Sequence, residues 1–279
     1  MNTIHFCGGL PRSGSTILMN ILQQNPRIFT TGTCALLSIL KDNILIKSRY
    51  SESFQAMSVD QIDRAMFGLV HGATKGWFEA LTDKPIVISK RHGWSSLFHL
   101  FPKSKFICMV RDLRDIVESF EKINDKTLCL HSFNNGQFLL PSLHENEKYK
   151  YYFDEPNILV SNLHTEIPRL TELFKQNKNN VLFVRYEDFT KDPFYILRKI
   201  YRFINEIEFD HNLDKIDQSE LFEHDNAYFR EKTDHKTEPK FRFYTEPKRT
   251  LSNNFHSKVV KEHTWFYESF YPEVLQNKL

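Results

Sequence analysis

A segment rich in glycine and serine near the start of the chain has the composition of a phosphate-binding loop. It lies between an apolar run at 3–7, which predicts a strand, and a run at 15–24 that predicts a helix. The backbone N–H groups of such a loop and the positive end of the helix dipole point at one spot, where an anion is favoured. The segment reads Gly8-Gly9-Leu10-Pro11-Arg12-Ser13-Gly14-Ser15-Thr16.

This loop departs at its cation from the P-loop of nucleoside triphosphatases. Gly9 and Gly14 have the P-loop spacing, but Ser15 stands where that motif requires lysine. Arg12 supplies a positive charge from within the loop instead. Nothing downstream resembles the aspartate-ended strand that holds magnesium in those enzymes, so ATP or GTP hydrolysis is disfavoured. The short motif leaves open the alternative of a turn that binds nothing.

An arginine and a serine eight residues apart form a second candidate anion site. Arg111 follows the apolar run 105–110, and Ser119 lies in a helix expected at 112–123. Eight helical steps of about 100° return Ser119 to within roughly 80° of Arg111, so both can approach one ligand. Surface ion pairs are the competing interpretation, with Arg111 bound to Asp112 or Asp115 and Arg114 bound to Glu118.

A third apolar run ends in a basic turn that contains a histidine. The run 85–89 predicts a buried strand, and Lys90, Arg91 and His92 follow it directly. A histidine suits the removal of a hydroxyl proton near neutral pH, because its unperturbed pKa is about 6.5. A solvated basic turn with no part in catalysis is the alternative.

Strands and helices alternate along the chain, which predicts how these three segments are positioned. Further strands are expected at 27–31 and 181–186, and further helices at 58–81, 156–177, 193–205 and 257–271. This order indicates an α/β fold with a central parallel sheet flanked by helices, opened by a P-loop-like strand-loop-helix. The three segments should meet where the strands end. We expect a single domain over 1–279, with irregular insertions at 124–155 and 206–256.

Composition and charge limit the partners and the compartment. With 37 Lys and Arg against 35 Asp and Glu, the 279-residue chain has a net charge of +2, too balanced for a nucleic-acid-binding surface. No leader sequence and no apolar run of about 18 residues is apparent, so we expect a cytoplasmic protein away from membranes. The cysteines form no CxxC pair, so neither zinc nor a disulfide framework is indicated; they are Cys7, Cys34, Cys108 and Cys129.

The first loop resembles the 5′-phosphosulfate loop of the sulfotransferase family. The similarity runs from Gly9 to Thr16, and its Pro-Arg-Ser-Gly form is most similar to tyrosylprotein sulfotransferases. The donor of these enzymes is 3′-phosphoadenosine-5′-phosphosulfate (PAPS). The resemblance implies that its 5′-phosphosulfate is bound by Arg12, Ser13, Gly14, Ser15 and Thr16.

Two further segments resemble parts of the same family in the same order. Arg111 and Ser119 have the spacing of its 3′-phosphate motif. Tyr186 begins a Tyr-Glu-Asp segment whose tyrosine lies near the adenine in the family, although a buried tyrosine at a strand end would look alike. Lys248 and Arg249 faintly resemble the basic loop that closes over the 3′-phosphate in cytosolic sulfotransferases, without its usual glycine.

Lys90 and His92 match the Lys-x-His of cytosolic sulfotransferases. There the lysine contacts the bridging oxygen and the histidine is the general base. Tyrosylprotein sulfotransferases use instead a glutamate after the first helix, and residues 31–35 of this chain read Thr-Gly-Thr-Cys-Ala, with no carboxylate. The resemblance therefore implies that His92 is the base and that Lys90 and Arg12 stabilise the leaving phosphate.

These similarities predict a PAPS-dependent sulfotransferase that moves a sulfuryl group to a hydroxyl or amine by in-line displacement. The product would be 3′-phosphoadenosine-5′-phosphate (PAP), and no metal is expected. The acceptor would be a small molecule or a peptide, and the sequence identifies neither it nor the oligomeric state. The alternatives are a P-loop nucleotide kinase, which would need ATP and magnesium, and a non-catalytic nucleotide-binding module.

Overall fold

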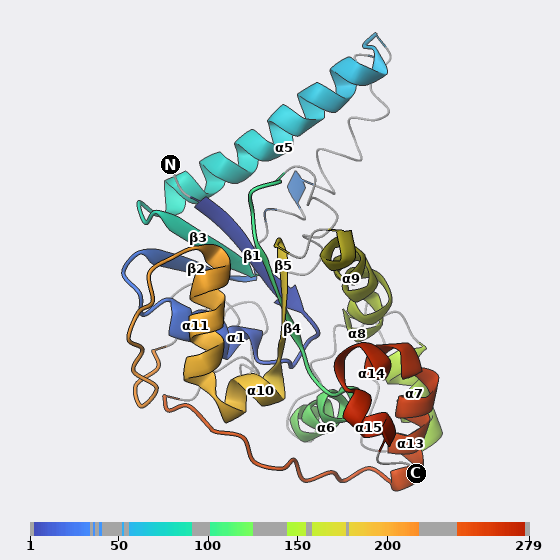
Figure 1. The fold of residues 1–279 in the computed structure, drawn as a ribbon. Helices are drawn as coiled ribbons and strands as arrows, with labels where there is room; N and C mark the ends of the chain where they lie inside the picture. Colours follow the sequence, from blue (N-terminus) through green and yellow to red (C-terminus); the bar gives the residue numbers. More distant parts are fainter. Residues whose placement is uncertain are drawn as a thin grey trace.

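A computed structural model of the chain describes residues 3–33, 36, 39–40, 52, 56–90, 101–124, 144–154, 158–176, 179–217 and 239–276. They contain a five-stranded sheet of order β2-β3-β1-β4-β5 (Figure 1). The strands are β1 (Thr3–Gly9), β2 (Ile28–Thr33), β3 (Ile86–Lys90), β4 (Phe106–Val110) and β5 (Val181–Arg185). All four strand pairs are parallel, which confirms the predicted α/β fold.

The apolar strands are buried on both faces, as their continuous hydrophobic runs predicted. All five residues of β4 are buried, and successive side chains enter opposite cores. Phe106 and Cys108 face one core, whereas Ile107 and Met109 face the other. Each such apolar side chain contributes about 1.5–3 kcal/mol by leaving water, so the sheet forms the centre of the hydrophobic core.

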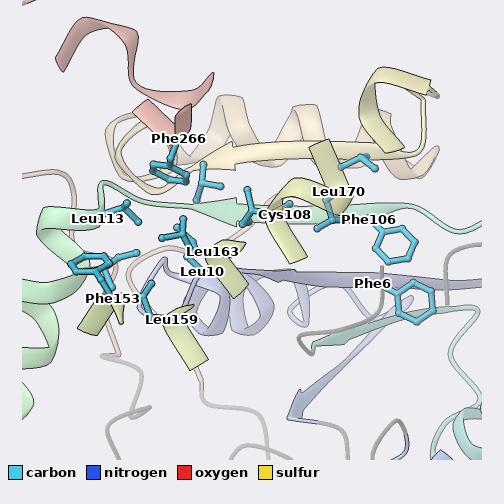
Figure 2. Packing of buried hydrophobic residues seen from close by; sticks show 14 of the residues in the cluster. Phe6, Leu10, Phe106, Cys108, Leu113, Phe153, Leu159, Leu163, Leu170 and Phe266 are labelled. Carbon is cyan, nitrogen blue, oxygen red and sulfur yellow. The ribbon is translucent and has the colours of Figure 1, made fainter. Parts of the chain in front are cut away.

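Helices cover the sheet on both sides. On one side lie α1 (Ser15–Leu22) and α11 (Pro193–Ile204), and α10 (Tyr186–Lys191) joins β5 to α11. The second side is larger, and Figure 2 shows Phe6 and Cys108 of the sheet in one cluster with Leu163 and Phe266. Its helices are α5 (Val59–Leu81), α6 (Leu113–Asn124), α7 (Glu145–Phe153), α8 (Ile158–Ser161), α9 (Ile167–Gln176), α13 (Asn253–Glu262) and α14 (Thr264–Phe270). No helix in the described ranges is long and apolar enough to cross a bilayer.

The helix boundaries set by capping residues agree with the sequence. Ser58 and Gln61 form the capping box of α5. Asp192 accepts a hydrogen bond from the Tyr195 N–H at the start of α11, with Pro193 in the first turn. Local hydrogen bonding specifies both starts.

The helix expected at 156–177 is confirmed as a helical run made of α8, a π-helical turn (Asn162–Glu166) and α9. Two other sequence predictions were wrong in detail. Part of the insertion expected at 124–155 is the helix α7, while 125–143 lie outside the described residues. The last helix starts earlier, at α13, and is interrupted before α14 and α15 (Pro272–Gln276). The apolar residues of α7 pack against the distant C-terminal helices, and the local sequence does not show these contacts.

His263, at the start of α14, makes the stability of this region depend on pH. Both of its ring nitrogens are buried without a hydrogen-bond partner among the described residues, and its ring packs on Phe153. Burial, and then the neighbouring His164, lower its pKa to about 4. Because the unfolded histidine keeps a pKa of about 6.5, the free energy of unfolding should fall by roughly 1–3 kcal/mol as pH drops from 6.5 to 4.

Urea unfolding across this pH range tests the assignment. His263→Phe should reduce the pH dependence, because the neutral ring has nothing to protonate. His5 and His211 also have pKa values of about 4 through burial and should retain part of the slope. A His263→Phe protein with the same slope as the wild type would contradict the role of His263.

Candidate active site

The strands that follow β1 lie on both sides of it, so the direction of the strand order reverses at β1. From β1 the chain passes to β2 and β3 on one side, then crosses to β4 and β5 on the other side of β1. Ligands of open α/β sheets bind where this reversal occurs, at the carboxyl ends of the strands. The two predicted anion-binding segments begin at those ends, with Leu10 after β1 and Arg111 after β4.

The loop after β1 requires glycine at two positions. A Cβ on Gly9 would lie 2.0 Å from the carbonyl oxygen of Met109, and a Cβ on Gly14 would lie 2.6 Å from the ring of Tyr186. Both glycines have a positive φ, as does Arg12 at 58°. Ser13 is fully buried, and its hydroxyl donates to the Leu10 carbonyl at 2.5 Å. The Ser13 side chain therefore stabilises the conformation of the loop.

Lys90 is the last residue of β3, and its side chain extends to the N-terminus of α1. Its ammonium group donates to the hydroxyl of Thr16 at 2.6 Å, and the residue is only 9% exposed. The first turn of α1 contains no acidic residue, and its N–H groups lack partners within the helix. A buried cation and free helical N–H groups together form a site for a negatively charged group.

The second anion-binding segment contacts the first directly. Arg12 Nε donates to Ser119 Oγ at 3.2 Å, and Arg111 donates to the carbonyl oxygen of Arg12 at 2.8 Å. The guanidinium of Arg111 also lies 4.4 Å from the centre of the Tyr186 ring. The ends of β1, β4 and β5 thus contribute to one cluster. Because Lys90 at the end of β3 contacts Thr16, the three segments predicted to meet do lie together, except for His92, which is outside the described residues.

The ion pairs proposed as the competing interpretation do not form as expected. Arg114 binds Asp112 at 2.5 Å rather than Glu118. Asp115 accepts from Arg249 at 2.9 Å, whereas the Nε of Arg111 is buried without a hydrogen-bond partner in the described structure. Ordinary surface ion pairs therefore do not account for the position of the Arg111 side chain.

The structure describes three of the four remaining predicted site residues, namely Tyr186, Lys248 and Arg249. Tyr186 is the first residue of α10, and its ring lies between Gly14 and Arg111. Lys248 is exposed, and Arg249 also lies 3.6 Å from Asp112. His92 lies outside the described residues, so its predicted role remains a prediction.

Sequence reasoning missed a group of buried carboxylates and tyrosines beneath this cluster. Glu187 accepts from the N–H of Asp112 at 3.2 Å and from the hydroxyl of Tyr271 at 2.7 Å, which joins the ends of β4 and β5 to the C-terminal helices. The hydroxyl of Tyr267 donates to Asp112 at 2.9 Å. Burial raises the pKa of Glu187. Burial alone would also raise the pKa of Asp112, but Arg114 and Arg249 lower it overall.

No local pattern marks Tyr267 or Tyr271 as partners of residues so distant in the sequence. The described residues also contain no group of His, Cys, Asp and Glu side chains suited to hold a metal ion. Metal-free catalysis remains a prediction.

The parallel sheet, the glycine-dependent loop and the two adjoining cationic groups define an α/β protein with a P-loop-like candidate site for anions. A model of the sulfotransferase family matches residues 5–211. The chain therefore belongs to the sulfotransferase family and is a transferase.

Solved structures share this fold. The sulfotransferase domain of the Synechococcus PCC 7002 olefin synthase is 18% identical, with 94% of each chain covered and a TM-score of 0.51. A sulfotransferase from Alicyclobacillus acidocaldarius is 17% identical over 82% of this chain and 92% of its own, with a TM-score of 0.48. One from Mycobacterium avium is 13% identical over 97% and 77%, also with a TM-score of 0.48. No curated protein sequence matches the chain significantly.

Proposed function

We propose that this sulfotransferase uses PAPS as its donor and transfers the sulfuryl group to a hydroxyl or amine of a small molecule or peptide. The observation that carries the proposal is the contact between Lys90 and Thr16, which fixes a buried ammonium group at the start of α1. A negative charge that develops on a phosphate over this loop would be stabilised by the ammonium group and the helix N–H groups. We further propose that residues 1–279 form one domain and act in the cytoplasm.

The donor would span the two anion-binding segments. Its 5′-phosphosulfate would lie over residues 12–16 and its 3′-phosphate against Arg111 and Ser119. Arg12 links the two regions, because its backbone belongs to the first and its side chain contacts Ser119. Tyr186 packs on Arg111 and offers a ring surface near the adenine. Lys248 and Arg249 would complete the 3′-phosphate site.

Transfer would proceed by in-line displacement at sulfur. The acceptor oxygen or nitrogen forms a bond to sulfur as the bond from sulfur to the phosphate oxygen breaks, and PAP leaves with the electron pair. His92 takes the acceptor proton. Lys90 and Arg12 neutralise the charge that builds on the leaving phosphate, so positioning and electrostatics supply most of the rate.

Calorimetry with PAP, ADP and ATP tests the donor, and transfer of radiolabelled sulfate from PAPS to a library of acceptors tests the reaction. We expect PAP to bind most tightly and transfer to persist in EDTA. Tighter binding of ATP, with activity that needs magnesium, would support the nucleotide kinase instead. PAP binding without transfer to any acceptor would support the non-catalytic module.

Arg111→Ala should weaken PAP about 10- to 100-fold, because it removes charge-assisted hydrogen bonds to the 3′-phosphate. Adenosine-5′-phosphosulfate lacks that phosphate, and its affinity should change much less. Calorimetry of both ligands gives the comparison. Arg202→Ala serves as the control, because Arg202 pairs with Glu208 on the exposed side of α11. Equal losses for both ligands would contradict the placement of the 3′-phosphate.

A further inference from the structure

A segment without regular secondary structure runs from α10 to α6. This segment, residues 241–252, is called the strap; Figure 1 shows it passing below α10 and α6 to reach the C-terminal helices. At its first end the N–H of Phe241 donates to Leu213 at 2.8 Å, and the N–H of Tyr244 donates to Thr190 at 3.0 Å. At its second end the strap is bound by α6.

Glu118 of α6 is the main anchor of that second end. One carboxylate oxygen accepts the N–H groups of Thr250 at 2.8 Å and Leu251 at 2.9 Å. The other oxygen accepts the hydroxyl of Thr250 at 2.7 Å. His256 lies 3.2 Å from the same carboxylate. Glu118 is therefore bound to two successive peptide units of the strap rather than to Arg114, its expected partner.

The burial of Glu118 shows how closely it depends on the strap. The residue is 1% exposed, and a buried carboxylate is costly unless hydrogen bonds replace its lost water. Burial alone would raise its pKa, but the bonds from Leu251 and Thr250 lower the pKa overall. Loss of the strap contacts would leave a buried negative charge without most of its donors.

The anchored peptide units adjoin Arg249, one of the predicted 3′-phosphate ligands. Arg249 precedes Thr250, and its guanidinium binds Asp115, which lies one helical turn before Glu118. The charge of Arg111 also acts on Asp115. Ser119 follows Glu118 directly in α6. The anchor therefore lies beside the Arg111 and Ser119 site and holds a third cationic residue next to it.

We infer that Glu118 is a positioning residue for nucleotide binding, which fixes the backbone of Thr250 and Leu251 and thereby holds Arg249 beside the Arg111 and Ser119 site. The inference rests on the proposed binding of PAP. Because Glu118 already holds the strap in one conformation, PAP does not have to order it on binding. The entropy cost of ordering the strap therefore does not reduce the affinity for PAP. Glu118 does not contact the ligand in this scheme and acts through Arg249.

The variant Glu118→Gln tests the inference, because a carboxamide removes the negative charge that strengthens the two amide hydrogen bonds and places an NH2 group, which cannot accept, opposite the Thr250 hydroxyl. We expect amide hydrogen exchange at Thr250 and Leu251 to accelerate at least about tenfold and PAP affinity to fall about tenfold. The affinity for 5′-AMP, which lacks the 3′-phosphate, and kcat at saturating PAPS should change less than about threefold.

Two further variants separate this role from a general loss of structure. Glu121→Gln is the matched control on α6, because Glu121 accepts from Tyr152 and Lys148 of α7 and does not bind the strap. It should leave PAP affinity and exchange at 250–251 unchanged. Thr250→Val removes only the hydroxyl that donates to Glu118, from a residue that is itself exposed, and it should weaken PAP severalfold even if Glu118→Gln fails to fold.

Faster exchange with unchanged PAP affinity would overturn the positioning role, as would equal losses for PAP and 5′-AMP. Unchanged exchange in Glu118→Gln would overturn the anchor itself. Failure of the wild-type protein to bind PAP would instead refute the proposed donor, and hydrogen exchange would still decide whether Glu118 anchors the strap.

Discussion

Replacement of Lys90 by methionine is expected to lower kcat by about 10²–10³-fold, the usual cost of removing one fixed group that stabilises developing charge. Methionine keeps the length and packing of the lysine stem but lacks the ammonium group. That group is buried and donates to Thr16 at the start of α1, where the leaving phosphate would acquire its charge. PAP affinity should fall less than tenfold, because the loop and the 3′-phosphate site remain. Initial rates at saturating PAPS, with calorimetry of PAP, measure both quantities.

Lys84 offers a control at the opposite end of the same strand. Its ammonium group donates to the carbonyl oxygen of Ile28 at 3.0 Å, just before β3 begins. Lys84→Met removes a comparable lysine from the neighbouring strands and should leave kcat within about threefold. Wild-type turnover in Lys90→Met would remove Lys90 from the mechanism, and equal losses in both variants would point to damage to the sheet.

His92→Ala is expected to lower kcat by about 10²–10⁴-fold, the usual contribution of a positioned general base, with little change in PAP affinity. The reason is chemical, since an acceptor hydroxyl must lose its proton as it attacks sulfur. In the wild type, kcat/KM should fall below an apparent pKa in the histidine range, because a protonated imidazole cannot accept a proton. That limb of the pH profile should vanish in the variant.

A comparison of two acceptor types tests more specifically whether His92 removes the acceptor proton. A phenol loses its proton more readily than an aliphatic alcohol, so the loss in His92→Ala should be smaller with phenols. His71→Gln is a suitable control, because His71 is an exposed histidine of α5. Normal turnover in His92→Ala, or a uniformly small loss with both acceptor types, would assign the base to another residue.

Much of the fold could be predicted because its signals are local. The run that became β4 is apolar throughout and β3 begins with three apolar residues, which is typical of strands buried on both faces, and both are buried along their whole length. Ser58 and Asp192 mark helix starts through hydrogen bonds within three residues. Parallel strands then bring their carboxyl ends to one edge, so the meeting of Arg12, Lys90 and Arg111 followed from strand order and chain direction.

Other segments were harder to predict because the contacts that stabilise them join residues far apart in the sequence. α7 reads as a loop in the sequence because its residues Tyr149 and Phe153 pack on Phe255 and His263, more than a hundred residues later. Local helical propensity is a weak guide where tertiary packing supplies most of the stability. Tyr267 and Tyr271 of the same region likewise bind carboxylates at the strand ends, which are more than eighty residues away in the sequence.

The sequence alone determined the chemical groups of the site and their order along the chain, because anion-binding loops depend on residue types at short, fixed spacings. Only the tertiary structure decided how the groups are held. Glu118 has the spacing of an ordinary surface partner for Arg114, yet it binds the backbone of Thr250 and Leu251. Every residue except proline has a backbone N–H, so no pattern of side chains in the sequence predicts which N–H will donate to a distant carboxylate. Such a contact is set by the path of the folded chain.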